Sequence, residues 1–216
     1  MKIAIIGASG KAGSHILREA VMRNYDVTAI VKNKGVLRVA GAYDVLETDL
    51  FHLTHEQILP FDVIINAFSP SPGEEQLHVT AGQHLISLLQ GTAKKLFVVG
   101  SSGCLFIDDG ETIRLLDHID YPEHLASHAR AQLQNLEDLK NSSIQWSFLS
   151  PSALFDSDGP RTGHYTLGNE IVTVNSQFDS YISYADFAVA AIDELENKAF
   201  VNTIFTVASE NVNSAS

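Results

Sequence analysis

Three glycines near the start of the chain have the spacing of a turn that could hold a phosphate. Gly7, Gly10 and Gly13 follow the apolar run Ile3–Ile6, and a helical pattern comes after them. The first glycine would permit a tight turn, the second would let phosphates approach the backbone, and the third would let helix and strand pack closely. Amides at a helix N-terminus also favour an anion. The motif therefore predicts a site for a dinucleotide pyrophosphate. The alternative is an ordinary strand-to-helix turn that needs only small residues.

Further polar side chains stand where other apolar runs end. Lys32 occupies a place where Asp or Glu usually accepts hydrogen bonds from the adenosine ribose of NAD, so the lysine favours NADP(H) over NAD(H). A solvated loop lysine is the alternative. Asp49 could bond the adenine amino group or cap a short helix. Ser101 and Ser102 stand where a nicotinamide should lie, and either could bond a substrate carbonyl or serve only in a turn.

Strand and helix patterns that could position these residues alternate along the chain. The expected strands are Ile3–Ile6, Asp26–Val31, Tyr43–Glu47, Asp62–Ala67, Lys95–Gly100, Ile144–Leu149 and Thr203–Val207. The expected helices are Lys11–Arg23, Glu74–Leu89, Leu125–Lys140 and Tyr184–Glu196. This alternation predicts an α/β fold of the Rossmann-like, doubly wound type, with a mostly parallel sheet covered on both faces. A ligand would then bind beyond the carboxyl ends of the strands, beside the first strand.

Length and composition agree with one nucleotide-binding domain over residues 1–216. The formal net charge of −12 argues against a nucleic-acid partner, which basic side chains would have to hold. No apolar run reaches the roughly 18 residues of a membrane helix. The chain begins directly with a core strand and has one cysteine, Cys104, so we expect a cytoplasmic protein without an internal disulfide. We expect a monomer or homodimer acting on a small molecule, and a disordered tail over Glu210–Ser216.

Several of these motifs resemble a known family. The glycine turn, Val31-Lys32-Asn33 and Ile182–Ala188 look like the short-chain dehydrogenase/reductase superfamily. More narrowly, they resemble its atypical branch, the NAD(P)H-binding family, which includes flavin reductases and redox-sensing regulators. The segments Trp146–Ser152 and Gly159–Gly163 look most like the bacterial NADH-flavin reductases. The resemblance covers almost the whole chain and implies an NAD(P)H-dependent oxidoreductase.

The resemblance also implies roles for individual residues. It assigns Asp186 a structural role, as a cap or a loop tether. It implies cofactor contacts from Gly7, Ala8, Ser9, Gly10, Lys11, Ala12, Lys32, Asp49, Leu50, Ala67, Phe68, Ser101, Pro151, Ala153 and Phe155.

The turn-forming residues Gly159-Pro160 and Gly163 indicate that Asp156–Gly168 is a surface loop leading into a short hairpin. This segment could act as a substrate lid or be purely structural. Together, residues 155–183 are expected to form a small lobe on the substrate side.

The chain departs from the superfamily where carbonyl reduction is concerned. Carbonyl-reducing members place Tyr and Lys one helical turn apart, so that the lysine lowers the tyrosine pKa. Those positions fall here on His128 and Gln132, and the residue four places after Tyr121 is Leu125. Alcohol–ketone chemistry is therefore poorly supported. His128 could still donate a proton, because imidazole titrates near neutrality, or it could be a partly exposed helix histidine.

Hydride transfer to a flavin, taken as a substrate rather than a bound cofactor, needs less from the protein, because the remaining proton can come from solvent. We therefore expect a reductase of flavins or similar conjugated acceptors, with Ser101, Ser102 and His128 as the candidate catalytic residues. The alternatives are an NADP-binding redox sensor without catalysis, and a nucleotide-sugar epimerase or ketone reductase that uses His128 or Tyr121 in place of the usual tyrosine. No metal site is expected, since His118, His124 and His128 have no acidic or cysteine partner at a familiar spacing.

Overall fold

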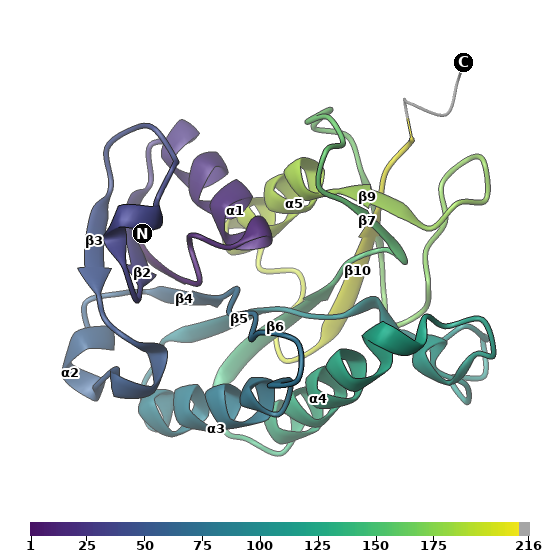
Figure 1. Cartoon of the computed structure of the whole chain (residues 1–216), viewed down its shortest axis with the longest axis horizontal. Coiled ribbons are helices and arrows are strands. Elements are labelled where there is room, and N and C mark those ends of the chain that lie inside the picture. The colour runs from purple at the N-terminus through teal and green to yellow at the C-terminus, as the bar shows by residue number, and fades with distance from the viewer. Residues whose placement is uncertain (212–216) are drawn as a thin grey trace.

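One sheet of eight strands runs through the centre of the protein, seen in a computed structural model that describes residues 1–211 (Figure 1). Its strand order is β3-β2-β1-β4-β5-β6-β10-β8, and every neighbouring pair is parallel except β10 and β8. The strands are β1 Lys2–Ile6, β2 Asp26–Val31, β3 Asp44–Glu47, β4 Val63–Asn66, β5 Lys95–Val99, β6 Gln145–Ser150, β8 Thr166–Gly168 and β10 Ile204–Ala208. The predicted Rossmann-like α/β fold is confirmed.

Both faces of the sheet are buried, which explains why the strands read as continuous apolar runs. In β1, Ile3 and Ile5 point into one core while Ala4 and Ile6 point into the other, and all four are at most 2% exposed. Successive side chains of a strand point to opposite faces, so an apolar run of this kind fits only a strand covered on both sides. The sequence pattern and the two-sided core therefore have the same cause.

Helices cover the two faces in pairs. Figure 1 shows α1 and α5 packed together on one face and α3 and α4 on the other. The helices are α1 Lys11–Met22, α2 His55–Ile58, α3 Leu77–Leu89, α4 Glu123–Lys140 and α5 Tyr184–Asn197. Helix α3 begins three residues later than predicted, because the backbone from Ser71 to Leu77 forms separate turns first. The short α2 was not predicted from the sequence.

The hairpin into which the loop Asp156–Gly168 was expected to lead is not formed. Strand β7 (Leu154–Asp156) pairs in parallel with β9 (Tyr181–Ser183), while β8 joins the edge of the main sheet beside β10. Each of these three strands has only three residues and pairs with a segment distant along the chain. Turn-forming residues within the segment therefore could not reveal the pairing.

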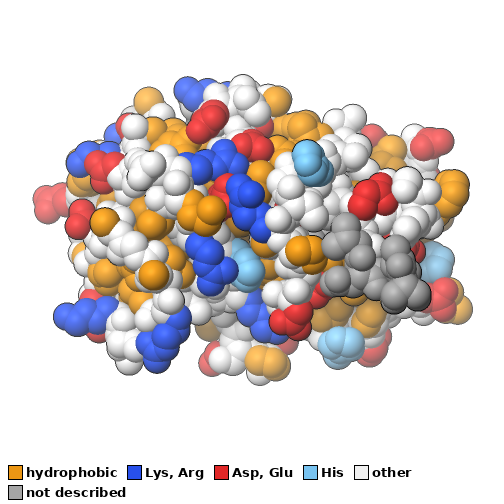
Figure 2. Space-filling view, turned by 90° about the horizontal axis from the view of Figure 1, so that it is seen from above, with side chains coloured by type: hydrophobic (Ala, Val, Ile, Leu, Met, Phe, Trp, Pro, Cys, Tyr) orange, Lys and Arg blue, Asp and Glu red, His pale blue; other side chains and the backbone are white. Residues whose placement is uncertain are grey.

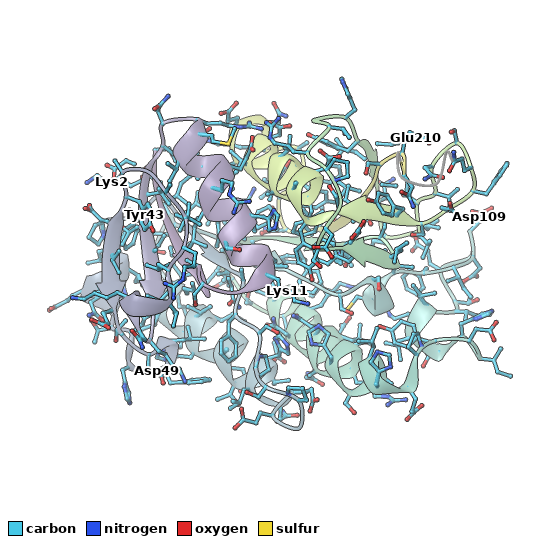
Figure 3. All side chains as sticks on the ribbon, turned by 45° about the horizontal axis from the view of Figure 1, so that its top comes forward. Lys2, Lys11, Tyr43, Asp49, Asp109 and Glu210 are labelled. Carbon is cyan, nitrogen blue, oxygen red and sulfur yellow. The ribbon has the colours of Figure 1, made fainter. Side chains whose placement is uncertain are left out.

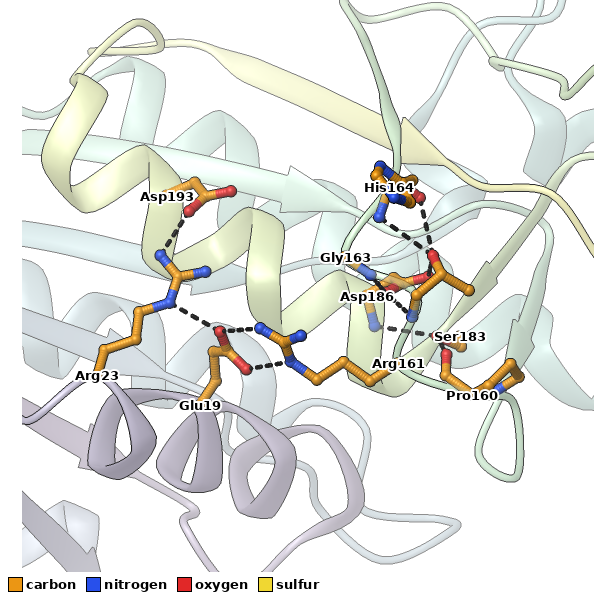
Figure 4. Close-up of polar contacts among 10 residues, drawn as sticks. Glu19, Arg23, Pro160, Arg161, Gly163, His164, Ser183, Asp186 and Asp193 are labelled. Carbon is orange, nitrogen blue, oxygen red and sulfur yellow. Dashed lines mark hydrogen bonds and ion pairs between the residues drawn. The ribbon is translucent and has the colours of Figure 1, made fainter.

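The segment between β7 and β8 is held against α1 and α5 by charged side chains (Figure 4). The Asp186 carboxylate accepts hydrogen bonds from the backbone amides of Thr162 and Gly163, both at 2.8 Å. The buried Glu19 carboxylate of α1 accepts two hydrogen bonds from Arg161, at 2.8 and 2.9 Å, and one from Arg23 at 2.7 Å. The prediction that Asp186 serves as a loop tether is confirmed.

No helix within residues 1–211 is long and apolar enough to cross a membrane. The tail expected to be disordered, 210–216, falls mostly beyond the described residues, since 212–216 lie outside them.

Candidate active site

A cavity of about 920 Å³ opens at the carboxyl ends of the parallel strands. It lies beside β1, where the chain changes direction across the sheet: β2 and β3 continue on one side of β1, and β4, β5 and β6 on the other. Residues that directly follow these strands line it. They are Gly7 after β1, Lys32 after β2, Thr48 near the end of β3, Ala67 after β4, Gly100 after β5 and Pro151 after β6. This is the position at which open α/β sheets bind ligands.

The glycine turn forms one wall of the cavity, and two of its glycines are required by the backbone. Gly7 has a φ of +73°, a conformation that side chains disfavour, and a Cβ there would lie 2.5 Å from the Ala67 carbonyl oxygen. A Cβ on Gly13 would lie 2.2 Å from the Gly7 carbonyl oxygen. Helix α1 therefore approaches the turn as closely as backbone allows. No side chain caps the first turn of α1, which also contains no acidic residue, so its amides favour an anion.

Lys32 and Asp49, which follow β2 and β3, form an ion pair beside the cavity. The Lys32 Nζ and Asp49 Oδ2 atoms are 3.0 Å apart, and Lys32 lines the cavity whereas Asp49 does not. The Asp49 carboxylate also accepts a hydrogen bond from the Phe51 amide at 3.0 Å, which caps the turn Leu50–His52. Figure 3 shows Lys11 at the start of α1 and Asp49 in the loop after β3. The structure thus gives Asp49 the capping position that was one of its two predicted roles.

The net negative charge of the chain is unevenly distributed. Figure 2 shows several Lys and Arg side chains near the centre of one face, with acidic side chains both beside them and toward the edges. An anionic ligand can therefore approach this protein despite a net charge of −12.

Hydroxyl groups gather at the end of β5. Ser101, Ser102 and Tyr121 all line the cavity. Burial raises the pKa of Tyr121, against a smaller lowering effect of the two serine side chains, so its phenol stays neutral near pH 7 and can donate a hydrogen bond. Ser101 Oγ also accepts a hydrogen bond from the Gly103 amide at 3.3 Å. The turn role and the cavity position predicted as alternatives for Ser101 thus occur together.

Two histidines and a glutamine continue this polar wall along α3 and α4. His128 Nδ1 lies 3.1 Å from His78 Nε2, and His78 Nδ1 lies 3.2 Å from Gln132 Nε2. Burial lowers the pKa of His78 to about 3, with a further contribution from the neighbouring His128. Burial also lowers the pKa of His128, against a smaller opposing effect of Glu75. Both imidazoles are therefore neutral near pH 7 and present no cation.

Aromatic rings form the remaining wall. The rings of Phe155 and Tyr184 stack with centroids 3.6 Å apart and an angle of 10° between their planes, and both residues line the cavity. Phe155 comes from β7 and Tyr184 from the first turn of α5. A flat apolar surface of this kind suits a flat ligand.

The structure brings most of the predicted site residues to this one cavity. Those that line it are Gly7, Ser9, Gly10, Lys11, Ala12, Lys32, Leu50, Ala67, Phe68, Ser101, Ser102, His128, Pro151, Ala153 and Phe155. Ala8 and Asp49 do not, because Ala8 points into the core and Asp49 faces its cap. No residue of the predicted lid 156–168 lines the cavity.

Sequence reasoning missed His78, Tyr184 and Glu74 among the lining residues. His78 and Tyr184 lie in the first turns of α3 and α5, at the carboxyl edge of the sheet. A position at the start of a predicted helix was the only feature of the sequence that could have indicated them as site residues. Conversely, Cys104 is fully buried, and burial raises the pKa of its thiol to about 12, so it is no nucleophile. His118 and His124 do not line the cavity, and within residues 1–211 no group of three metal-ligating side chains is found.

Comparisons with known proteins agree with this geometry. Residues 7–198 match the family model described as NAD(P)H-binding. YwnB of Bacillus subtilis, a protein described as uncharacterized, is 50% identical over 212 residues, which cover 97% of this chain and 99% of YwnB.

Solved structures are similar over nearly the full length. SP1627 of Streptococcus pneumoniae, titled a "putative NADH-flavin reductase", is 39% identical over 97% of this chain and 100% of its own, with a TM-score of 0.92. A structure titled a "putative epimerase", from Bacteroides thetaiotaomicron, is 32% identical over 96% of both chains, with a TM-score of 0.85. The chain has an oxidoreductase-like fold with a cavity suited to a nicotinamide coenzyme, and it belongs to the NAD(P)H-binding family.

Proposed function

We propose that this protein is an NAD(P)H-dependent reductase of a flavin or a similar flat conjugated acceptor. The observation that carries the proposal is the lining of the cavity, which combines the stacked rings of Phe155 and Tyr184 with neutral hydrogen-bonding side chains. The two positions of the tyrosine–lysine pair are occupied by His128 and Gln132, and both line the cavity. A site of this kind can position two flat rings, but it lacks the cation that activates a catalytic tyrosine.

The residues divide the work along the cavity. The glycine turn and the first-turn amides of α1 bind the pyrophosphate, and Pro151 and Ala153 cover the coenzyme beyond β6. Phe155 and Tyr184 orient the rings and exclude water, which makes positioning the main catalytic contribution. The bound coenzyme supplies a hydride, and the acceptor takes it up. His128, Ser101 and Tyr121 donate hydrogen bonds to the acceptor, whose remaining proton comes from solvent.

We infer that NADP(H) is preferred over NAD(H). Lys32 stands at the end of β2 with 64% of its side chain exposed, so it can turn toward a 2′-phosphate. The Asp49 carboxylate competes for the same ammonium group, which makes the preference moderate.

The test is NADPH oxidation measured with and without flavin mononucleotide, a quinone or dichlorophenolindophenol. We expect turnover that depends on the acceptor and is lost in Gly7→Val, where the branched side chain would collide with the Ala67 backbone. Gly91→Val, at a glycine with open space around it and a similarly strained φ of +75°, is the control for nonspecific strain. Tight NADP binding without any acceptor-dependent turnover would exclude the reductase and favour a redox sensor.

A second candidate is an epimerase or ketone reductase, favoured by the hydroxyl groups of Tyr121, Ser101 and Ser102, which line the same cavity. The Tyr121 phenol would donate to a substrate carbonyl without help from a lysine. Tyr121→Phe distinguishes the two, because it would abolish carbonyl reduction while flavin reduction would fall only a few-fold.

A further inference from the structure

A chain of hydrogen bonds connects the end of β5 to the cavity through two buried side chains. Gln132 Nε2 lies 3.3 Å from the Val99 carbonyl oxygen and 3.2 Å from His78 Nδ1, and His78 Nε2 lies 3.1 Å from His128 Nδ1. His78 and Gln132 are each 3% exposed. Their protons are therefore placed mainly by these protein partners, because little of either side chain is open to water.

The Val99 carbonyl sets the donor-to-acceptor direction of these hydrogen bonds. A backbone carbonyl can only accept, so Val99 requires that Gln132 turn its NH₂ group toward it. The second hydrogen of that NH₂ group points at His78 Nδ1, which must accept and hence carries no proton. A neutral imidazole then carries its proton on Nε2, from which His78 donates to His128 Nδ1.

The position of the His128 ring proton follows from the bond to His78. His128 accepts at Nδ1, so its own proton is on Nε2, the ring nitrogen for which residues 1–211 offer no partner. His128 lines the cavity, and this N–H is available to a ligand. The lowered pKa values of both imidazoles agree with neutral rings, and a protonated His78 would also place an N–H against the Gln132 NH₂ group.

We propose that Val99, through the positioning residues Gln132 and His78, fixes His128 as a neutral hydrogen-bond donor toward the acceptor substrate. The inference deepens the proposed function and rests on it for the identity of the ligand. It restricts the substrate to molecules that present a carbonyl oxygen or an unprotonated ring nitrogen to His128. In this arrangement His128 donates a hydrogen bond but does not give up its proton, because a neutral imidazole that lost its Nε2 proton would become an imidazolate.

The reverse arrangement gives a distinct outcome. If the Gln132 carbonyl oxygen faced His78, each imidazole would carry its proton on Nδ1, and His128 would offer the cavity a lone pair. This arrangement would bring the Gln132 and Val99 oxygens together. The repulsion between these two oxygens is the reason for assigning the NH₂ group of Gln132 to Val99. In the assigned arrangement, Gln132 Oε1 is buried without a hydrogen-bond partner.

Heteronuclear NMR of the ring nitrogens of the full chain, with and without NADP, tests the assignment directly. The signals of His78 and His128 are identified by their loss in His78→Gln and His128→Gln. We expect both rings to carry the proton on Nε2, and Nδ1 protonation of either ring would overturn the inference. This readout needs no turnover, so it fails or succeeds independently of the reductase proposal.

Variants add a functional test. Gln132→Glu replaces the NH₂ group by an acceptor and should move the His78 proton to Nδ1, leaving His128 with a lone pair toward the cavity. We expect kcat with flavin to fall by roughly 100-fold, the lower end of the loss seen when one positioned donor is removed. His128→Gln, whose amide nitrogen can stand in for Nε2, should keep most activity, and His128→Leu should not.

Gln145→Glu, at an exposed glutamine that begins β6, controls for the added charge. Equal loss in His128→Gln and His128→Leu would contradict a donor role. Unchanged kcat in Gln132→Glu, with NADPH binding intact, would contradict the positioning role of Gln132.

Discussion

At the scale of single residues, coenzyme choice depends on Lys32 and its competitor Asp49. Lys32→Asp should lower the ratio of NADP to NAD affinity by roughly 10- to 100-fold, the loss expected when a hydrogen bond to a charged group is replaced by repulsion. The two affinities, and hence their ratio, are measured by titrating the protein with each coenzyme and following its fluorescence. Asp49→Asn should raise it, because the Lys32 ammonium would lose the carboxylate at 3.0 Å.

Lys34 provides the matched control. It lies two residues further along, pairs with Glu47 at 3.7 Å, and does not line the cavity. Lys34→Asp should leave the ratio unchanged. A ratio that responds equally to Lys32→Asp and Lys34→Asp would mean that the charge acts at long range and not by contact with the phosphate.

The glycines of the turn should separate binding from stability. Gly13→Ala would place a Cβ 2.2 Å from backbone and should lower the free energy of unfolding by about 1–3 kcal/mol, the usual cost of overpacking. Gly10→Ala meets its nearest atom only at 3.2 Å, so it should cost less stability and mainly weaken NADPH binding. Urea unfolding and NADPH titration of both variants test this division. Equal stability of the two variants would contradict it.

At the scale of elements, the Glu19 carboxylate joins α1 to the segment after β7. Its pKa is lowered, chiefly by the hydrogen bonds from Arg161 and also by those from Arg23, with burial acting in the opposite direction. A carboxyl whose pKa is lower in the folded than in the unfolded state stabilises the fold above the unfolded value, about 4.5. That contribution is lost as the pH falls through the lower folded value.

Glu19→Gln should therefore lower the free energy of unfolding at pH 7 by about 1–3 kcal/mol, and by much less at acid pH. Urea unfolding at several pH values between neutral and acid measures both effects. Glu137→Gln is the control, because its 3.4 Å pair with Lys140 is solvent-exposed and contributes little. A loss at pH 7 that persists undiminished at acid pH would show that Glu19 acts by packing and not through its charge.

At the scale of the whole molecule, coenzyme binding should stabilise the fold, since the cavity is assembled from the ends of many strands and helices and does not exist in the unfolded chain. At 100 times its dissociation constant, NADPH should add about 2.7 kcal/mol, which corresponds to a rise in Tm of roughly 5–11 °C for a domain of this size. Differential scanning fluorimetry measures the shift. Gly10→Ala should require more NADPH for the same shift, and NADH should give a smaller shift than NADPH at equal concentration.

Elements with a local signal could be predicted from the sequence. The apolar runs that became β1, β2, β4, β5, β6 and β10 could be recognised because both faces of the sheet are buried. The glycine turn could be recognised because the φ of +73° at Gly7 and the close backbone contacts at Gly7 and Gly13 require glycine. Since parallel strands end at one edge of a sheet, the residues after these strands could also be predicted to meet.

Features that depend on contacts between distant segments could not be predicted before the fold was known. The pairing of β7 with β9 joins residues far apart in the chain, and nothing in either three-residue strand specifies its partner. His78 enters the site because α3 packs beside α4, which brings it to His128 fifty positions further along the chain. The direction of their hydrogen bonds then follows from one carbonyl of β5, because a buried imidazole takes its proton position from its neighbours and not from its own sequence.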